Sequence, residues 1–129
     1  MKSVLFLCVG NSCRSQMAEG FGRKYLKNWE VFSAGSKPAG YVHPYAIEVM
    51  REKGIDISNQ RSKGINELPN RSWDIVVLVC SDEECPFVPG KVVEVWGIED
   101  PIGKDLDFYR KVRDEIERKV LELLEKYGD

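Results

Sequence analysis

The residues best suited to chemistry form one short run near the N-terminus, Cys8-Val9-Gly10-Asn11-Ser12-Cys13-Arg14-Ser15. The run follows an apolar stretch typical of a buried strand and precedes a helical pattern. Backbone N–H groups in a strand-to-helix turn, together with the helix N-terminus, favour a bound anion. Because the same field stabilises a thiolate, we predict that Cys8 is an ionised nucleophile and that Arg14 holds a tetrahedral oxyanion bidentately.

The oxyanion is expected to lie against the residues that follow the nucleophile, namely Gly10, Asn11, Ser12, Cys13, Arg14 and Ser15. Gly10 gives the turn conformational freedom, and Asn11 tolerates a left-handed backbone. A buried structural cysteine is the alternative reading of Cys8, but the convergence of thiol, donors and arginine favours catalysis. We interpret Cys13 as a loop or core thiol without an assigned partner.

Two further groups follow predicted strands. Asp100, before Pro101, is a candidate general acid. Cys80 ends an apolar run, so Cys8 and Cys80 would share one sheet edge if the first and third strands are neighbours. Cys85 lies five positions further on, and the segment must turn for the two thiols to meet. Ser81 and Glu84 match a capping box, which predicts a single helical turn of marginal stability.

Strand and helix patterns alternate along the chain. Apolar runs predict strands at 3–9, 30–34, 75–79 and 91–95, and helical spacing predicts helices at 15–26, from Pro44 to Gly54, and through 112–127. Region 55–70 is ambiguous, with one short helix around 64–68. We therefore predict one α/β domain over residues 1–129, doubly wound, with about four parallel strands flanked by helices.

Composition narrows the function classes. The 129 residues carry a formal net charge of -2, so no overall basic field attracts nucleic acid. The apolar start is too short for a signal peptide, and no apolar run is long enough to cross a membrane. We expect a cytoplasmic monomer that contacts no membrane and whose thiols are kept reduced.

Two other cysteine chemistries are less favoured. Cys8-x4-Cys13 and Cys80-x4-Cys85 could be halves of a four-thiolate zinc module. Arg14 beside Cys13 suits an anion loop better than a zinc site. His43, the only histidine, is expected to precede or cap the helix that begins at Pro44, which argues against a cysteine-histidine protease pair.

The string Cys8-Val-Gly-Asn-Ser-Cys-Arg-Ser-Gln-Met-Ala-Glu-Gly resembles the low-molecular-weight protein tyrosine phosphatases and, more closely, the thioredoxin-coupled arsenate reductases built on the same fold. The resemblance continues along the chain at Ser33-Ala34-Gly35, Asp56-Ile57-Ser58-Asn59, Cys80-Ser81-Asp82 and Trp96-Gly97-Ile98-Glu99-Asp100-Pro101. After Asp100-Pro101, Ile102-Gly103-Lys104 replaces the aromatic residues typical of the phosphatases, as in the reductases.

This resemblance implies that Cys8 attacks arsenate, that Asp100 protonates the leaving oxygen, and that Cys80 and Cys85 relay a disulfide to a thioredoxin-like reductant. The alternative is a phosphatase that hydrolyses phosphate monoesters through a phosphocysteine. The spacing between Cys80 and Cys85 is shorter than is common in the reductases, which leaves the geometry of the final disulfide open.

Some members of the family hold potassium beneath the loop with asparagine, glutamate, serine and aspartate side chains. Asn11, Glu19 and Ser33 match the first three, but Lys63 stands where the aspartate would fall. We expect the Lys63 ammonium to take the cation's place, pair with Glu19 and support the loop. No metal and no other cofactor is then expected.

Overall fold

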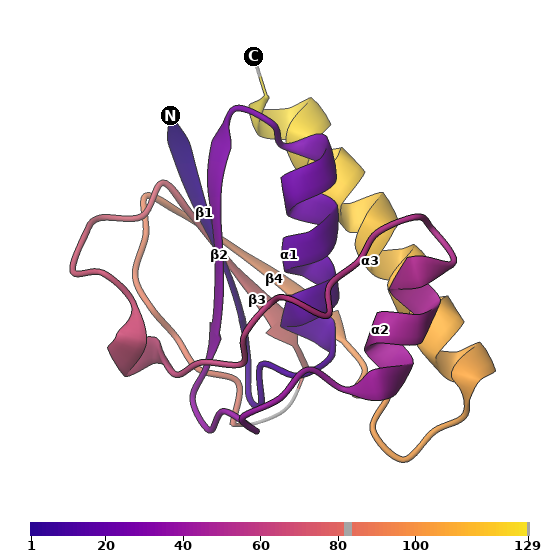
Figure 1. The fold of residues 1–129 in the computed structure, drawn as a ribbon. Coiled ribbons are helices and arrows are strands. Elements are labelled where there is room, and N and C mark those ends of the chain that lie inside the picture. Colours follow the sequence, from indigo (N-terminus) through magenta and orange to yellow (C-terminus); the bar gives the residue numbers. More distant parts are fainter. Residues whose placement is uncertain (82–83, 129) are drawn as a thin grey trace.

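The computed structural model describes residues 1–81 and 84–128. A four-stranded sheet with strand order β2-β1-β3-β4 lies at its centre, and every neighbouring pair is parallel (Figure 1). The strands are β1 (Lys2–Cys8), β2 (Trp29–Gly35), β3 (Ile75–Cys80) and β4 (Val92–Ile98). The helices are α1 (Arg14–Tyr25), α2 (Pro44–Arg51), α3 (Leu106–Tyr127) and the short 3-10 helix η1 (Ile65–Glu67).

The sheet divides the hydrophobic core into two layers. Side chains alternate across a strand, so Val4 and Phe6 of β1 face the three α-helices while Leu5 and Leu7 face the other way. The three α-helices lie together on one side of the sheet (Figure 1). The opposite layer is covered by η1 and neighbouring loops, which supply Ile65, Leu68 and Val88. Connections between parallel strands thus cover both faces, as the doubly wound prediction requires.

The predicted elements are present, with two informative differences in where they end. β4 extends to Ile98 because Trp96 and Ile98 alternate with exposed positions and reach the core. α2 ends at Arg51, earlier than predicted, and the chain turns at Gly54 with a positive φ of 75°. Region 55–70 holds only η1 as helical structure. The predicted turn that begins at Ser81 includes residues 82 and 83, which lie outside the described residues.

The carboxyl ends of β1, β3 and β4 meet at one edge of the sheet. β1 pairs directly with β3, with Leu7 opposite Leu78, which confirms that the first and third strands are neighbours. Cys8, Cys80 and the loop that carries Asp100 therefore lie at the same edge. None of the helices described is long and apolar enough to span a bilayer.

Candidate active site

Cys8 ends β1 with its side chain almost fully buried, at 2% exposure. The backbone N–H of Asn11 donates to Cys8 Sγ at 3.2 Å, and Ser15 Oγ lies 2.8 Å from the same sulfur. Ser15 Oγ also accepts a hydrogen bond from Asn11 Nδ2 at 2.7 Å, which leaves the serine proton available for the sulfur. Two hydrogen-bond donors therefore converge on Cys8 Sγ.

The segment after β2 orients the anion loop, defined here as residues 8–15. N–H groups of this segment bind loop carbonyls in the pairs Lys37–Val9, Ala39–Gly10 and His43–Ser12, each at 2.9 Å. In a planar trans peptide the N–H of the next residue points opposite to the carbonyl. The loop N–H groups that follow these carbonyls consequently face inward, as the Asn11 N–H does toward Cys8.

Asn11 supplies the unusual backbone of the anion loop, with a φ of 48°. This confirms the left-handed conformation predicted for it. The glycine that the loop requires on steric grounds is Gly35, because a Cβ there would meet Val9 O at 2.4 Å and Asn11 N at 3.0 Å. A Cβ at Gly10 would meet only Ser12 Oγ, at an ordinary 3.5 Å. Gly10 itself has no positive φ, so the conformational freedom predicted for it is not used for a left-handed backbone.

A network of buried polar side chains supports the anion loop through the side chain of Asn11. Asn11 Nδ2 donates to Ser33 Oγ at 3.0 Å, and Ser33 Oγ donates to Glu19 Oε1 at 2.5 Å. Lys63 Nζ lies 3.6 Å from Glu19 Oε1 and 3.4 Å from Ser33 Oγ, so the pairing predicted for Lys63 and Glu19 is present. Arg23 binds the other oxygen of the buried Glu19 carboxylate at 2.8 Å. Two cations thus compensate this buried charge.

Arg14 and Asp100 approach the anion loop from two elements. Arg14, the first residue of α1, donates through Nη1 to Ile98 O at 2.9 Å, and its Nη2 lies 3.8 Å from Asp100 Oδ2. Asp100 Oδ1 accepts from the N–H of Ile102 at 3.0 Å, which orients the carboxylate. A cavity of about 250 Å³ opens between them, lined by Cys8, Val9, Gly10, Ser12, Cys13, Arg14, Glu84, Asp100 and Ile102. The Cys8 thiol, the Arg14 guanidinium and the Asp100 carboxyl group therefore line one small cavity.

Cys13 has contacts that the sequence did not assign. Its Sγ lies 3.6 Å from Tyr109 Oη and 3.7 Å from Ser12 Oγ. Burial raises the pKa of the Cys13 thiol to about 11. Cys13 is consequently a neutral thiol at physiological pH, in agreement with its interpretation as a loop or core cysteine.

Cys80 and Cys85 form a disulfide, with their Cα atoms 5.8 Å apart. A spacing of five positions is therefore enough for Cys80 and Cys85 to form a disulfide, although this spacing is shorter than is common in the reductases. Cys8 and Cys13 remain free thiols. With two of the four cysteine sulfur atoms in a disulfide, a four-thiolate zinc site cannot form in this state, and no other cluster suited to a metal is found among the described residues.

The sequence assigned no role at the site to three residues that lie near it. Glu84 lines the cavity and pairs with Lys37 at 2.6 Å, Gln16 Nε2 donates to Asn11 O and Oδ1 at 3.0 Å, and Tyr109 reaches Cys13 from α3. The Lys37–Glu84 and Cys13–Tyr109 contacts join residues that are distant in the sequence, and the Gln16–Asn11 contact depends on the conformation of the turn between them. No local spacing signalled them. His43, by contrast, caps α2 as predicted, with Nδ1 accepting from Tyr45 N at 3.1 Å.

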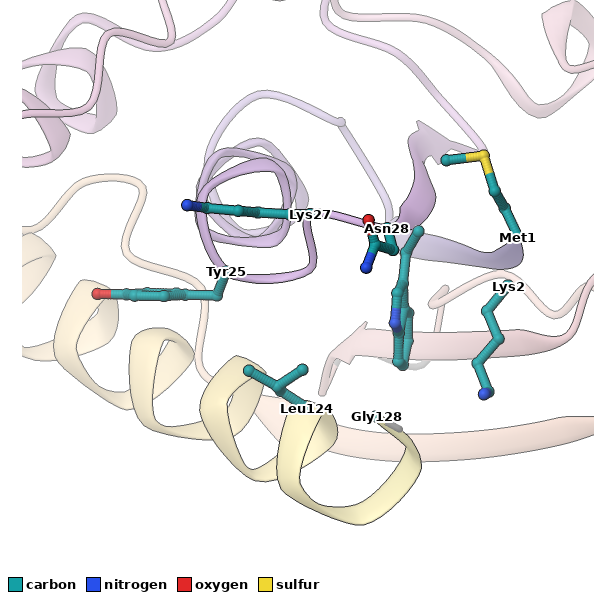
Figure 2. A pocket seen from close by; sticks show the side chains of 8 residues that line it. Met1, Lys2, Tyr25, Lys27, Asn28, Leu124 and Gly128 are labelled. Atoms are coloured by element: carbon teal, nitrogen blue, oxygen red, sulfur yellow. The ribbon is translucent and has the colours of Figure 1, made fainter.

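A larger depression, of about 600 Å³, lies beside the start of β1, whereas Cys8 ends that strand (Figure 2). It is lined by Met1, Lys2, Tyr25, Lys27, Asn28, Trp29, Leu124 and Gly128. These side chains include neither a thiol nor a carboxylate. The smaller cavity at Cys8, where reactive groups converge, is the better candidate for chemistry.

Comparisons with known proteins agree with this geometry. Residues 3–128 match the family model described as low molecular weight phosphotyrosine protein phosphatase. The chain is 50% identical to arsenate reductase 2 of Staphylococcus saprophyticus over 92% of this chain and 93% of that protein. It is 48% identical to the arsenate reductase of Brevibacillus brevis over 96% of this chain and 95% of that protein.

Solved structures give the same result. An arsenate reductase in the phosphate binding state superposes with a TM-score of 0.87 at 39% identity, over 98% of both chains. An arsenate reductase in the oxidized state superposes with a TM-score of 0.82 at 38% identity, again over 98% of both chains. The chain therefore belongs to the low-molecular-weight phosphotyrosine protein phosphatase family, in the branch that contains the arsenate reductases.

Proposed function

We propose that this protein reduces arsenate to arsenite through a cysteine relay that a thioredoxin-like dithiol protein resets. One observation carries the proposal. A nucleophilic cysteine in an anion loop and a disulfide between two further cysteines lie at the ends of adjacent parallel strands, β1 and β3. A phosphatase needs the first of these features and has no use for the second.

The first step is attack by the Cys8 thiolate on arsenic(V) held by the loop N–H groups and Arg14. A sulfur–arsenic bond forms and an arsenic–oxygen bond breaks, while Asp100 gives its proton to the departing oxygen, which leaves as water. The position of Asp100 on the cavity wall supports this role. Its link to Arg14 keeps the carboxyl group close to the bound oxyanion.

The relay then delivers two electrons. The Cys80 thiolate attacks Cys8 sulfur, the sulfur–arsenic electron pair stays with arsenic, and arsenite leaves behind a Cys8–Cys80 disulfide. Cys85 attacks Cys80 next, which restores the Cys8 thiolate and forms Cys80–Cys85. Cys80 Sγ lies 3.9 Å from the carbonyl oxygen of Leu7, which directly precedes Cys8. This proximity supports the proposed attack of Cys80 on Cys8. The state described here corresponds to the end of the relay.

A phosphatase is the second candidate, favoured by the anion loop and the acid. Its phosphocysteine would form and hydrolyse in the same cavity. Among the described residues that line this cavity there is no aromatic ring that could stack on an aryl ester. A small inorganic anion fits it better, and we expect hydrolysis of aryl phosphates only as a weak side activity.

A thioredoxin-coupled arsenate assay tests the proposal on the parent protein and on Cys80→Ser and Cys85→Ser. We expect both variants to lose multiple turnover, with Cys85→Ser still releasing one arsenite per molecule when thioredoxin is omitted. Hydrolysis of an aryl phosphate should stay near the parent rate in both. Cys13→Ser is the matched control for loss of a thiol: it keeps the three relay cysteines, so multiple turnover should persist even where the KM for arsenate changes, because Cys13 lines the cavity. Parental arsenate turnover in both relay variants would refute the proposed function.

A further inference from the structure

One acidic side chain of the oxyanion cavity comes from the disulfide segment, defined here as residues 80–91. Glu84 lines the cavity together with Cys8 and Arg14, and it directly precedes Cys85 in the chain. Its position therefore depends on a neighbour that is covalently bound to Cys80. The proposed chemistry assigns Glu84 no role, although a carboxylate beside a site for an oxyanion opposes binding.

Lys37 links Glu84 to the anion loop. Lys37 Nζ lies 2.6 Å from Glu84 Oε1, while the backbone N–H of Lys37 donates to Val9 O at 2.9 Å. The pair has two effects on a dianion that approaches Cys8. The Glu84 carboxylate places a negative charge at the cavity, and the positive charge of Lys37 is already paired with that carboxylate. Both effects lower oxyanion affinity in the disulfide form.

We propose that Glu84 makes the oxyanion affinity of this protein depend on the state of the Cys80–Cys85 disulfide. In the disulfide form the 5.8 Å separation of the two Cα atoms holds Glu84 beside the cavity, and the oxyanion is disfavoured. Reduction removes this restraint, so Glu84 is released from the cavity and Lys37 becomes available to attract the anion. The inference rests on the proposed oxyanion site at Cys8.

Such coupling has a use in the cycle. A molecule that awaits its reductant would not hold a substrate that it cannot reduce, and the next oxyanion would bind only after the relay is reset. Coupling between two equilibria is reciprocal. Because the oxyanion binds the dithiol form more tightly, it must also raise the reduction potential of the Cys80–Cys85 pair.

The effect should be modest because both side chains of the Lys37–Glu84 pair are mostly exposed, and exposed charges are screened. We expect inorganic phosphate to bind the disulfide form about tenfold more weakly than the dithiol form. For a two-electron couple, a tenfold ratio corresponds to a rise of about 30 mV in reduction potential at saturating phosphate.

Calorimetric titration with inorganic phosphate tests the inference on the parent, Glu84→Gln and Glu122→Gln, each in the disulfide form and after reduction with dithiothreitol. Glu122→Gln removes an equal charge from an exposed position near the end of α3. Glu84→Gln should strengthen phosphate binding several-fold in the disulfide form and leave the dithiol form unchanged. Glu122→Gln should change neither.

A second variant gives an independent check. Lys37→Gln should weaken phosphate binding by the dithiol form more than by the disulfide form, in which the lysine is already paired. Equal phosphate affinities in the two parent forms, or a Glu84→Gln protein that behaves like the parent, would overturn the inference and leave the proposed function intact. Failure of both parent forms to bind phosphate would instead refute the oxyanion site itself.

Discussion

The anion loop and the first part of the disulfide segment meet at the cavity beside Cys8, yet the two regions are built in opposite ways. From Asn11 to Ser15 every side chain is buried, and neighbouring segments hold the loop through backbone and side-chain hydrogen bonds. In the disulfide segment, none of the described residues from 84 to 91 is buried, and Phe87 is 64% exposed.

The difference follows from what each region must do in the proposed reaction. Stabilisation of a transition state requires donors that are already in place, because reorganisation during the reaction costs free energy. A disulfide relay requires one cysteine to change partners and then to present the new bond to another protein. Rigidity in the first region and loose packing in the second thus serve one catalytic cycle.

The largest loss of activity should come from a substitution that adds a methyl group against the backbone of the anion loop. In Gly35→Ala the new Cβ meets the backbone of Val9 and Asn11, so the anion loop must shift. We expect arsenate reduction and aryl phosphate hydrolysis to fall together by about 100-fold, since small displacements of reacting groups cost this much. Gly64→Ala, at the position bridged to Gly35, is the matched control because its Cβ meets only ordinary contacts. Full activity in Gly35→Ala would show that the loop is not rigid.

Hydrogen exchange compares the two regions directly. The amides of Lys37, Ala39 and His43, which bind the loop carbonyls, should exchange about 100-fold or more slowly than those of residues 84–88. Reduction of the disulfide should change exchange in residues 84–88 and leave the three loop-binding amides protected. Equal exchange rates in both regions would contradict the comparison.

Lys63 tests how the rigid region is supported. Lys63→Gln leaves the buried Glu19 carboxylate with Arg23 as its remaining cation, and we expect a loss of about 1 to 3 kcal/mol in the free energy of unfolding, measured with urea. In the parent protein Lys63 already provides the positive charge. Potassium chloride should therefore not raise turnover above that in sodium chloride of equal ionic strength. Clear activation by potassium would refute this role of Lys63.

The smallest effect concerns Cys13, a thiol in the rigid region that the relay does not use. Because its pKa is raised to about 11, Cys13 should remain protonated and resist iodoacetamide at neutral pH, while Cys8 reacts. Alkylation of Cys13 should increase only as the pH approaches 11. Mass spectrometry of alkylated peptides reads both sites, and saturating phosphate should protect Cys8. Rapid alkylation of Cys13 at neutral pH would contradict its assignment.

Structural features that depend on neighbouring residues in the chain were predicted correctly from the sequence. The apolar run before Cys8 and the helical spacing after Arg14 predicted a strand, a turn and a helix, and α/β alternation then predicted the parallel sheet. The left-handed Asn11 also followed from residue type. The end of β4 was missed because Gly97 interrupts the apolar pattern, although Trp96 and Ile98 still face the core.

By itself, the sequence determined which chemical groups the candidate site holds: a thiol, an arginine and loop amides at one strand end, with Asp100 and the cysteines Cys80 and Cys85 at or after the ends of other strands. Only the tertiary structure decided which glycine the loop needs, that Cys80 and Cys85 bond across their short spacing, and that Glu84 and Lys37 meet beside the cavity. The physical reason is range. Residue type and spacing govern backbone conformation within a few positions, whereas contacts such as Gly35 with Val9 or Lys37 with Glu84 exist only after the strands have paired.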